Sequence, residues 1–285
     1  MMARAAGPTF EVPAELAFDA SAAAGLLVDF IRRESLKAGF SRAVLGLSGG
    51  VDSAAAAALA VRALGPANVV CALLPYRTSR PDSLSDARGV VRLLGARSVR
   101  LAITPMIDAY FARRRGASAL RRGNKMARER MAVLYDLSAR ERALVVGTSN
   151  KTELLLGYGT VHGDLACAIN PLGDLYKTQV RGLALHLGVH PRIVLKVATA
   201  DLWPGQSDEE EIGALYADVD RLLHLLIDRR ASPEEAVARG FPRPMVRRIM
   251  MRVRNSQFKR RTPLIAKVSQ RTVGIDFLYP RDWGC

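Results

Sequence analysis

The sequence predicts an α/β fold: a doubly wound parallel sheet of about five strands with flanking helices, followed by a C-terminal helical part. One observation is that short aliphatic runs alternate with helical patterns between residues 21 and 146. Another is that a glycine turn directly follows the first of these runs, and a third is that only helical patterns recur after residue 208. With 285 residues, the chain is long enough for one large domain of this kind.

The first elements form a helix followed by a strand, turn and helix unit. Residues 21–37 carry apolar side chains at helical spacing, which predicts a helix that packs over the sheet. Residues 42–45 are aliphatic enough for a buried strand, and the alanine-rich run 54–63 favours a helix. The glycines between this strand and helix are therefore expected at a carboxyl end of the sheet.

The alternation continues through the first half of the chain, with glycine and proline marking boundaries, as at Gly65-Pro66. Because crossovers between parallel strands share one hand, the connecting helices should cover both faces of the sheet. The predicted elements are strands over 68–74, 97–103 and 143–146 and helices over 83–94, 104–111 and 124–140, with an exposed connection over 113–122.

The second half of the chain is irregular and glycine-rich over residues 147–173 and helical afterwards. Ser232 stands three residues before Glu235, the arrangement of a capping box at the start of a helix. The predicted helices cover residues 178–187, 209–216, 219–229, 233–239 and 244–257, with a loop at 203–206.

The composition is strongly basic, with 42 Lys and Arg against 27 Asp and Glu and a formal net charge of +15. Such a surplus suits either a nucleic-acid binder or sites for small polyanions. The basic clusters are scattered and lack interleaved aromatic side chains, which favours solvated surface and small-anion sites over nucleic acid.

The cysteines, Cys71, Cys167 and Cys285, are odd in number and widely spaced, which predicts free thiols in a reducing cytoplasm and no zinc site. No apolar run approaches the roughly 18 residues of a membrane-spanning helix, and residues 1–7 lack the apolar core of a signal peptide. We therefore expect a cytoplasmic protein.

The turn after the first strand has the chemistry of an anion cradle. Gly49 and Gly50 let the backbone approach a ligand closely, and the first N–H groups of the next helix face the same space. Ser48 and Ser53 add hydroxyl donors, and Asp52 places a carboxylate beside the anion, where a divalent cation would neutralise phosphates. No lysine precedes Ser53, so this is not the P-loop with a Gly-Lys-Ser/Thr ending. The alternative is an ordinary serine and glycine turn that caps a helix.

A second acidic residue, Glu153, lies in the loop after the fourth strand. If the first and fourth strands are neighbours where the strand order reverses, Asp52 and Glu153 meet in one crevice. Two carboxylates beside a triphosphate predict Mg²⁺. The alternative for Glu153 is a carboxylate that stabilises a helix N-terminus.

The turn resembles the Ser-Gly-Gly-x-Asp-Ser pyrophosphate loop of the N-type ATP pyrophosphatases. Further stretches, in order between about residues 21 and 270, resemble NAD synthetase. The resemblance implies the adenine-nucleotide alpha-hydrolase-like fold and a single domain over residues 1–285 with a tail from about residue 271. The stretches that carry it are Tyr76-Arg77-Thr78-Ser79, residues 124–131, residues 147–154, Gly163-Asp164, residues 170–178 and residues 199–209.

The resemblance also implies site residues. Asp52, Lys177 and Asp164 would be catalytic, and Asp52 and Glu153 would bind Mg²⁺. Arg128 and Lys259 would bind the dinucleotide substrate. The expected ATP-binding residues are Gly46, Leu47, Ser48, Gly49, Gly50, Val51, Asp52, Ser53, Thr148, Lys177 and Thr199.

Three of these roles have an alternative. Lys177 could be a solvated lysine at a helix start, Arg128 a surface arginine, and Asp164 a loop aspartate that accepts backbone N–H groups. Departures from the family pattern cluster on the dinucleotide side. They are Phe258 in place of a histidine beside Lys259, Val161 in place of a lysine and Ala168 in place of an aspartate.

The implied reaction is ATP-dependent amidation of nicotinic acid adenine dinucleotide (deamido-NAD) to NAD with ammonia, through an adenylate, with release of AMP and pyrophosphate. Only about forty residues precede the turn, so we expect no fused glutaminase. The resemblance also implies a homodimer. Two other classes stay open, another adenylating enzyme on the same fold and a nucleic-acid-binding protein.

Overall fold

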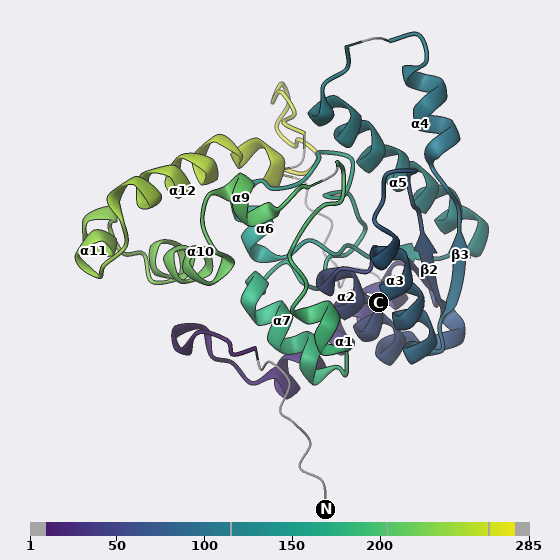
Figure 1. Cartoon of the computed structure of the whole chain (residues 1–285), viewed down its shortest axis with the longest axis horizontal. Coiled ribbons are helices and arrows are strands. Elements are labelled where there is room, and N and C mark those ends of the chain that lie inside the picture. The colour runs from purple at the N-terminus through teal and green to yellow at the C-terminus, as the bar shows by residue number, and fades with distance from the viewer. Residues whose placement is uncertain (1–9, 115, 204, 262, 277–285) are drawn as a thin grey trace, which may run out of the picture.

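The computed structural model describes residues 10–114, 116–203, 205–261 and 263–276 (Figure 1). Its centre is a parallel four-stranded sheet in the order β3-β2-β1-β4. The sheet has one strand fewer than the predicted five or so, although a parallel bridge between Val146 and Ile169 lies just past the last strand. The strands are β1 (Ala43–Gly46), β2 (Val69–Leu73), β3 (Arg97–Arg100) and β4 (Leu144–Val145).

Helices cover both faces of the sheet, which confirms the doubly wound prediction (Figure 1). One face packs against α1 (Ala20–Lys37), α2 (Val51–Leu64), α3 (Pro81–Leu94) and α7 (Lys177–His186). The other face packs against α4 (Thr104–Phe111) and α5 (Ala119–Glu141). Short 3₁₀ turns lie at η1 (Ala14–Leu16), η2 (Pro66–Asn68) and η4 (Gln257–Arg260).

The alanine run of α2 explains how this helix can lie at the centre of its layer. Ala54, Ala56 and Ala60 are fully buried, because α2 packs against α1, α7 and the sheet at once. Small side chains allow such close approach on several sides. The start of α2, which follows the glycine turn, is therefore held rigidly at the carboxyl end of β1.

The C-terminal helical part forms its own layer beside α6 (Lys151–Leu156) and α7, with a separate apolar core that includes Tyr176, Tyr216 and Ile249 (Figure 1). Ser232 and Glu235 form the predicted capping box. The elements are α9 (Asp208–Ile212), α10 (Tyr216–Leu223), the π-helical turn η3 (His224–Asp228), α11 (Pro233–Ala238) and α12 (Arg243–Asn255). No helix within the described ranges is long and apolar enough to cross a membrane.

Several predicted boundaries were wrong. The stretch expected to be irregular contains α6 (Lys151–Leu156), and α8 (Pro191–Val194) was not predicted at all. Helix α5 begins at Ala119, inside the expected exposed connection, with Ser118 as its cap. The helix expected over 209–216 ends at Ile212, because Gly213 adopts a left-handed conformation with φ of 79°.

Candidate functional site

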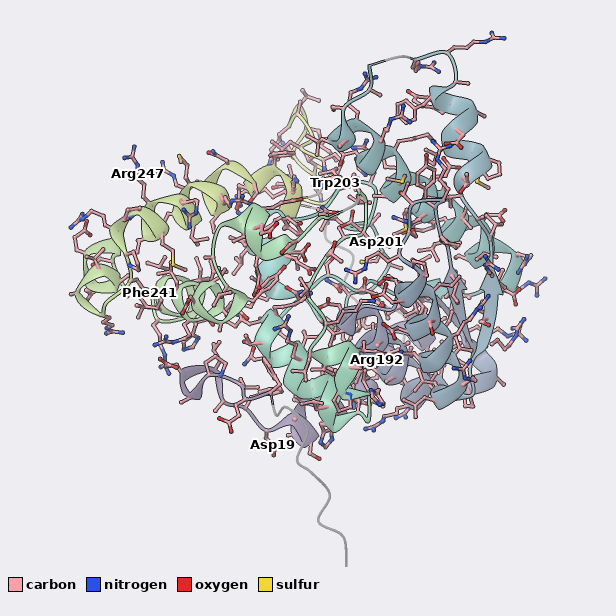
Figure 2. The ribbon with its side chains drawn as sticks, in the orientation of Figure 1. Asp19, Arg192, Asp201, Trp203, Phe241 and Arg247 are labelled. Atoms are coloured by element: carbon pink, nitrogen blue, oxygen red, sulfur yellow. The ribbon has the colours of Figure 1, made fainter. Side chains whose placement is uncertain are left out.

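A cleft of about 620 Å³ opens where the loops after β1, β2 and β4 meet the segment that leads into α9. Its size is within the range of roughly 300–1,000 Å³ that is usual for small-molecule sites. In Figure 2, Asp201 and Trp203, which line this cleft, lie between the sheet half of the molecule and the C-terminal helices. All eight residues of the glycine turn, Gly46, Leu47, Ser48, Gly49, Gly50, Val51, Asp52 and Ser53, line it as well.

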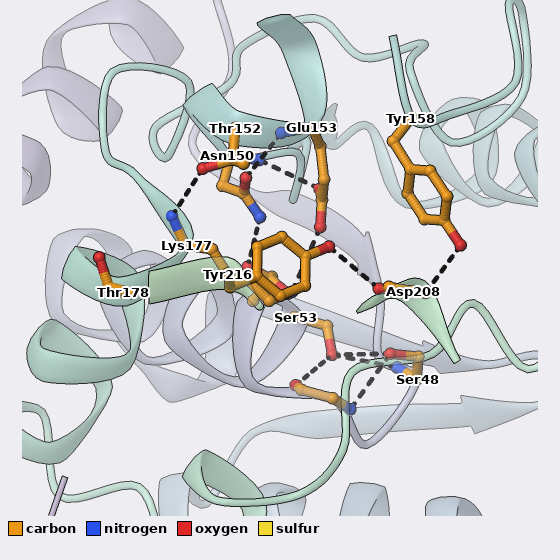
Figure 3. Close-up of polar contacts among 12 residues, drawn as sticks. Ser48, Ser53, Asn150, Thr152, Glu153, Tyr158, Lys177, Thr178, Asp208 and Tyr216 are labelled. Atoms are coloured by element: carbon orange, nitrogen blue, oxygen red, sulfur yellow. Dashed lines mark hydrogen bonds and ion pairs between the residues drawn. The ribbon is translucent and has the colours of Figure 1, made fainter. Parts of the chain in front are cut away.

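The backbone of the glycine turn is tightly constrained. Gly49 has φ of 87°, and a Cβ added there would lie 2.1 Å from the carbonyl oxygen of Ser83. The Ser53 hydroxyl donates to the Gly50 carbonyl at 2.9 Å and accepts from the Ser48 amide at 3.2 Å (Figure 3). These bonds keep the turn open toward the cleft at the N-terminus of α2, which is the geometry of an anion cradle.

Lys177 is the centre of the polar cluster in this cleft. Its side chain is only 4 % exposed, and its Nζ lies 2.5 Å from Asp52 Oδ2 and 3.2 Å from Glu153 Oε1. The three residues come from α7, α2 and α6, so the predicted neighbourhood of the first and fourth strands is confirmed. Lys177 is therefore not the solvated lysine of the alternative reading.

Asn150 connects the two acidic residues. Its side-chain amide donates to Asp52 Oδ1 at 2.9 Å, while its side-chain oxygen accepts from the Glu153 amide at 2.9 Å. Glu153 Oε2 accepts a hydrogen bond from the backbone N–H of Asn150 at 3.3 Å (Figure 3). Glu153 is thus the helix-capping carboxylate of the alternative and a member of the cluster at once, since its two oxygens serve different partners.

The cluster holds more negative charge than one lysine can balance. Burial raises the pKa of Glu153 to about 8, with Asp52 and Asp208 adding to the effect against the opposing charge of Lys177. Burial disfavours the ammonium of Lys177, yet Asp52 and Glu153 hold its pKa above the ordinary value. A divalent cation would relieve the excess of carboxylate charge.

The oxygen donors of Asp52 and Glu153 suit a hard cation such as Mg²⁺. Among the described residues, no group of three or more His, Cys, Asp or Glu side chains has the arrangement of a metal site. A cation at Asp52 and Glu153 would therefore take its remaining ligands from phosphate oxygens and water, as Mg²⁺ commonly does.

Asp208 is a member of the cluster that the sequence alone did not single out. It is 4 % exposed, and its oxygens accept hydrogen bonds from the hydroxyls of Tyr158 at 2.9 Å and Tyr216 at 3.2 Å (Figure 3). The ring of Tyr216 lies over the Lys177 ammonium, 5.2 Å from its centroid. Asp208 stands within the stretch 199–209 used for the resemblance, but nothing local indicated that its side chain points to Lys177.

The predicted residues Thr148, Asp164 and Thr199 also line the cleft. Asp164 Oδ1 accepts from the Thr160 amide at 2.8 Å, so the loop role of the alternative is real. The Asp164 residue stays accessible to solvent from the cleft. The surrounding protein nevertheless removes much of the hydration of its carboxylate, and this desolvation raises its pKa. Thr199 Oγ1 accepts from the Asp201 amide at 3.1 Å.

The two predicted substrate residues are separated. Lys259 lines the cleft, and its ammonium donates to the carbonyls of Gly157 at 2.7 Å and Gly159 at 2.8 Å. Arg128 is exposed on α5, where its Nε donates to the Val161 carbonyl at 3.1 Å, and it is not part of the cleft wall.

Other cations of the cleft were missed by the sequence analysis. The Nε of Arg130 donates to the Leu74 carbonyl at 3.1 Å, and Lys196 pairs with Asp86 at 3.0 Å beside the glycine turn. Arg130 was inside a stretch used for the resemblance, but only the fold shows that it faces the cleft while Arg128 does not. The remaining basic side chains are largely on the surface, as Arg247 on the outer side of α12 in Figure 2.

The thiols agree with the sequence prediction where the structure describes them. Cys71 is buried in β2 and Cys167 is partly buried, and both are free. Cys285 lies outside the described residues.

Comparison with known proteins gives a consistent result. The family model described as NAD synthase matches residues 24–263. The NH(3)-dependent NAD(+) synthetase of Trichlorobacter lovleyi is 55% identical over 259 residues, which cover 91% of this chain and 95% of the relative. Among solved structures, NMN synthetase from Francisella tularensis is 31% identical with a TM-score of 0.77, covering 88% of this chain and 99% of that one. The NH3-dependent NAD synthetase from Campylobacter jejuni, in complex with nitrate, is 34% identical with a TM-score of 0.75, covering 88% and 100%.

Proposed function

The chain belongs to the NAD synthase family, and we propose that its cleft carries out the ATP-dependent amidation of deamido-NAD to NAD with ammonia. The relatives of more than half identity that carry the name NH(3)-dependent NAD(+) synthetase support this reaction. The observation that carries the assignment to this cleft is the Lys177 cluster with Asp52 and Glu153, directly beside the glycine turn.

The chemistry requires activation, because a carboxylate is a poor acyl donor. A nicotinate oxygen attacks the α-phosphorus of ATP, the bond from that phosphorus to the bridging oxygen breaks, and pyrophosphate leaves. Ammonia then attacks the carbonyl carbon, the bond to the adenylate oxygen breaks, and AMP leaves. The protein has to hold a polyphosphate, stabilise the leaving pyrophosphate and accept a proton from the attacking nitrogen.

The phosphate side of this work falls to the glycine turn and Lys177. The turn supplies backbone N–H groups at a helix N-terminus, and Lys177 supplies a fixed positive charge to the departing pyrophosphate. Mg²⁺, held by Asp52 and Glu153, would neutralise charge on the triphosphate and free Lys177 from balancing both carboxylates. Thr148 and Thr199 offer hydroxyls to the rest of ATP, since both line the same cleft.

The substrate side is assigned to Asp164, Lys259 and Arg128. Asp164 is open to the cleft and has a raised pKa, which suits a carboxylate that receives a proton from ammonium or the attacking amine. Lys259 faces Asp164 from the cleft wall. Arg128 lies outside the cleft beside Val161, so it would meet a part of the dinucleotide that extends beyond the reacting end.

The larger organisation of the protein belongs to the same proposal. We assign residues 1–285 to one synthetase domain that forms a homodimer in the cytoplasm. The exposed apolar side chains of Leu26 and Leu36 on α1 and of Tyr135 on α5 offer surface for a two-fold contact. A monomer by sedimentation at micromolar concentration would contradict the dimer. The free thiols of Cys71 and Cys167 favour a reducing compartment.

The decisive assay supplies ATP, Mg²⁺ and ammonium with deamido-NAD and measures NAD and AMP. We expect one AMP for each NAD, no NAD when glutamine replaces ammonium, and loss of turnover in Asp52→Ala. A parallel reaction with nicotinic acid mononucleotide tests the acceptor, because one structural neighbour is named an NMN synthetase. Faster amidation of the mononucleotide, or no AMP with either acceptor, would refute the proposed function.

A further inference from the structure

We propose that Asp220 is a positioning residue for the proposed amidation: a buried carboxylate on α10 that clamps the start of α7 to α6 and so sets Lys177 against Glu153. The inference rests on the proposed function. Asp220 lies in the C-terminal helical part, far in sequence from both residues, and its side chain is fully buried.

The two oxygens of Asp220 serve two different helices. Oδ1 accepts from the hydroxyl of Thr152 in α6 at 2.5 Å, and Oδ2 accepts from the backbone amide of Thr178 in α7 at 2.8 Å. The Thr152 oxygen in turn accepts from the backbone amide of Lys177 at 3.0 Å (Figure 3). One carboxylate and one hydroxyl thus form a small unit between three helices.

This unit adds to the local cap of α7, in which the Gln179 side chain accepts from the Tyr176 amide at 3.0 Å. The first N–H groups of a helix have no partner within the helix, and at α7 those of Lys177 and Thr178 are satisfied by Thr152 and Asp220. A negative charge at this end is also favoured by the helix dipole. The backbone N–H groups of Lys177 and Thr178 are therefore fixed by side chains of α6 and α10.

The contacts of the unit lie on Lys177 or one residue from the reacting cluster. Thr152 precedes Glu153, and Thr178 follows Lys177. Since both flanking residues are fixed by the same carboxylate, Asp220 determines where the two helices bring the ammonium and the Glu153 carboxylate together. Burial raises the pKa of Asp220 to about 6, because the ionised carboxylate has no contact with solvent.

The test compares Asp220→Asn, Thr152→Val and the double variant by kcat and by KM for ATP and deamido-NAD. Asparagine keeps the shape of the side chain but turns one acceptor into a donor, so one of the two clamped helices loses its bond. We expect kcat to fall about 10- to 100-fold with less than about threefold change in either KM, the pattern of a misplaced reacting group. The double variant should be no slower than the slower single variant, because both changes break one unit.

Two further variants separate positioning from general stability. Thr152→Ser keeps the hydroxyl and should restore kcat to within about threefold of the unmodified protein, a rescue that Thr152→Val cannot give. Asp228→Asn is the matched control, since Asp228 links η3 to Lys151 and Tyr176 through side chains and does not touch the backbone of α7. Its kcat should stay within about twofold of the unmodified value, as for most substitutions away from a site.

The outcomes distinguish this inference from the proposed function. If the unmodified protein makes no NAD from deamido-NAD, the proposed function fails before any variant is compared. If it makes NAD and Asp220→Asn or Thr152→Val keeps full kcat, the positioning role is overturned. Losses that multiply in the double variant would overturn it too. Should Asp220→Asn fail to fold, the contrast between Thr152→Val and Thr152→Ser decides, since equal kcat for these two refutes the clamp.

Discussion

Replacing Lys177 with methionine should destabilise the folded protein and slow the reaction, because the burial and the partners of this ammonium make it important for both. The change keeps an unbranched chain of similar length but removes the cation that lies between Asp52 and Glu153, whose side chains are each 16 % exposed. Removing one partner of a buried ion pair costs roughly 3–5 kcal/mol, because the opposite charges stay behind in a poorly solvated place. Asp208, buried in the same cluster, increases the excess of negative charge.

The measurement is urea unfolding in chelator and in saturating Mg²⁺, together with kcat. We expect the loss of about 3–5 kcal/mol in chelator to shrink when Mg²⁺ supplies positive charge to the carboxylates. Without the Lys177 ammonium beside the leaving pyrophosphate, kcat should fall by a factor of roughly 10²–10³, the usual effect of removing one preorganised stabilising group.

The matched control is Lys151→Met, only two residues from Glu153. Lys151 pairs with Asp174 and Asp228, and its side chain is 19 % exposed against 4 % for Lys177. Ion pairs that stay in contact with solvent, as the pair with Asp174 does, contribute up to about 1 kcal/mol. If Lys177→Met unfolds at the same urea concentration as Lys151→Met and keeps its kcat, both the energetic and the catalytic reading of the cluster are wrong.

Three further predictions concern the same cleft. Burial raises the pKa of Glu153 to about 8, so the folded state binds a proton there more tightly than the unfolded state does. The stability that this proton contributes is complete at a pH below 4.5, the ordinary pKa of the group, and is lost as the pH rises through 8. Glutamine does not ionise, so the unfolding free energy of Glu153→Gln in chelator should increasingly exceed that of the unmodified protein as the pH rises from 4.5 to 8. A difference between the two proteins that does not change with pH would contradict this prediction. Gly49→Ala should raise the KM for ATP and cost at least about 1–3 kcal/mol more than Gly39→Ala, which shares the positive φ but has open space around it; equal costs would refute the close approach to Ser83. Arg128→Ala should raise the KM for deamido-NAD by roughly one to two orders of magnitude, about 1.5–3 kcal/mol, and leave that for ATP nearly unchanged; equal rises would place Arg128 on the wrong ligand.

The sequence was sufficient to predict the α/β class of the fold and the position of the glycine turn. Alternation of aliphatic and helical patterns predicted where the strands of the sheet lie along the chain and that helices cover both faces, because hydrophobic periodicity is a local property of the chain. The glycine turn was equally readable, since a strand, two glycines and an alanine-rich helix follow one another without a gap. The meeting of Asp52 with Glu153 was also predictable, because the rules for parallel sheets place the loops after neighbouring strands at one edge.

Local reading was weaker where elements are short. Helix α6 has six residues, too few for an apolar period to stand out from its glycine-rich surroundings. A signal did exist, since Asn150 and Glu153 have the spacing of a capping box, and the bonds between them confirm that pattern. The split between α9 and α10 depends on a left-handed glycine, Gly213, in a region of otherwise continuous helical pattern.

Tertiary structure alone decided which side chains complete the cluster. Asp208 and Asp220 come from the C-terminal helical part, and their partners Tyr158, Thr152 and Thr178 stand 42 to 68 positions away in the sequence. No periodicity or spacing connects such residues, because their meeting depends on how one helical layer docks against α6 and α7. The packing of α5 against the sheet likewise brings Arg130 to the Leu74 carbonyl in the cleft and leaves Arg128 outside it, although both stand on one helix. The sequence by itself therefore determined the fold and the glycine turn, whereas the packing of separate layers determined the electrostatic environment of Lys177.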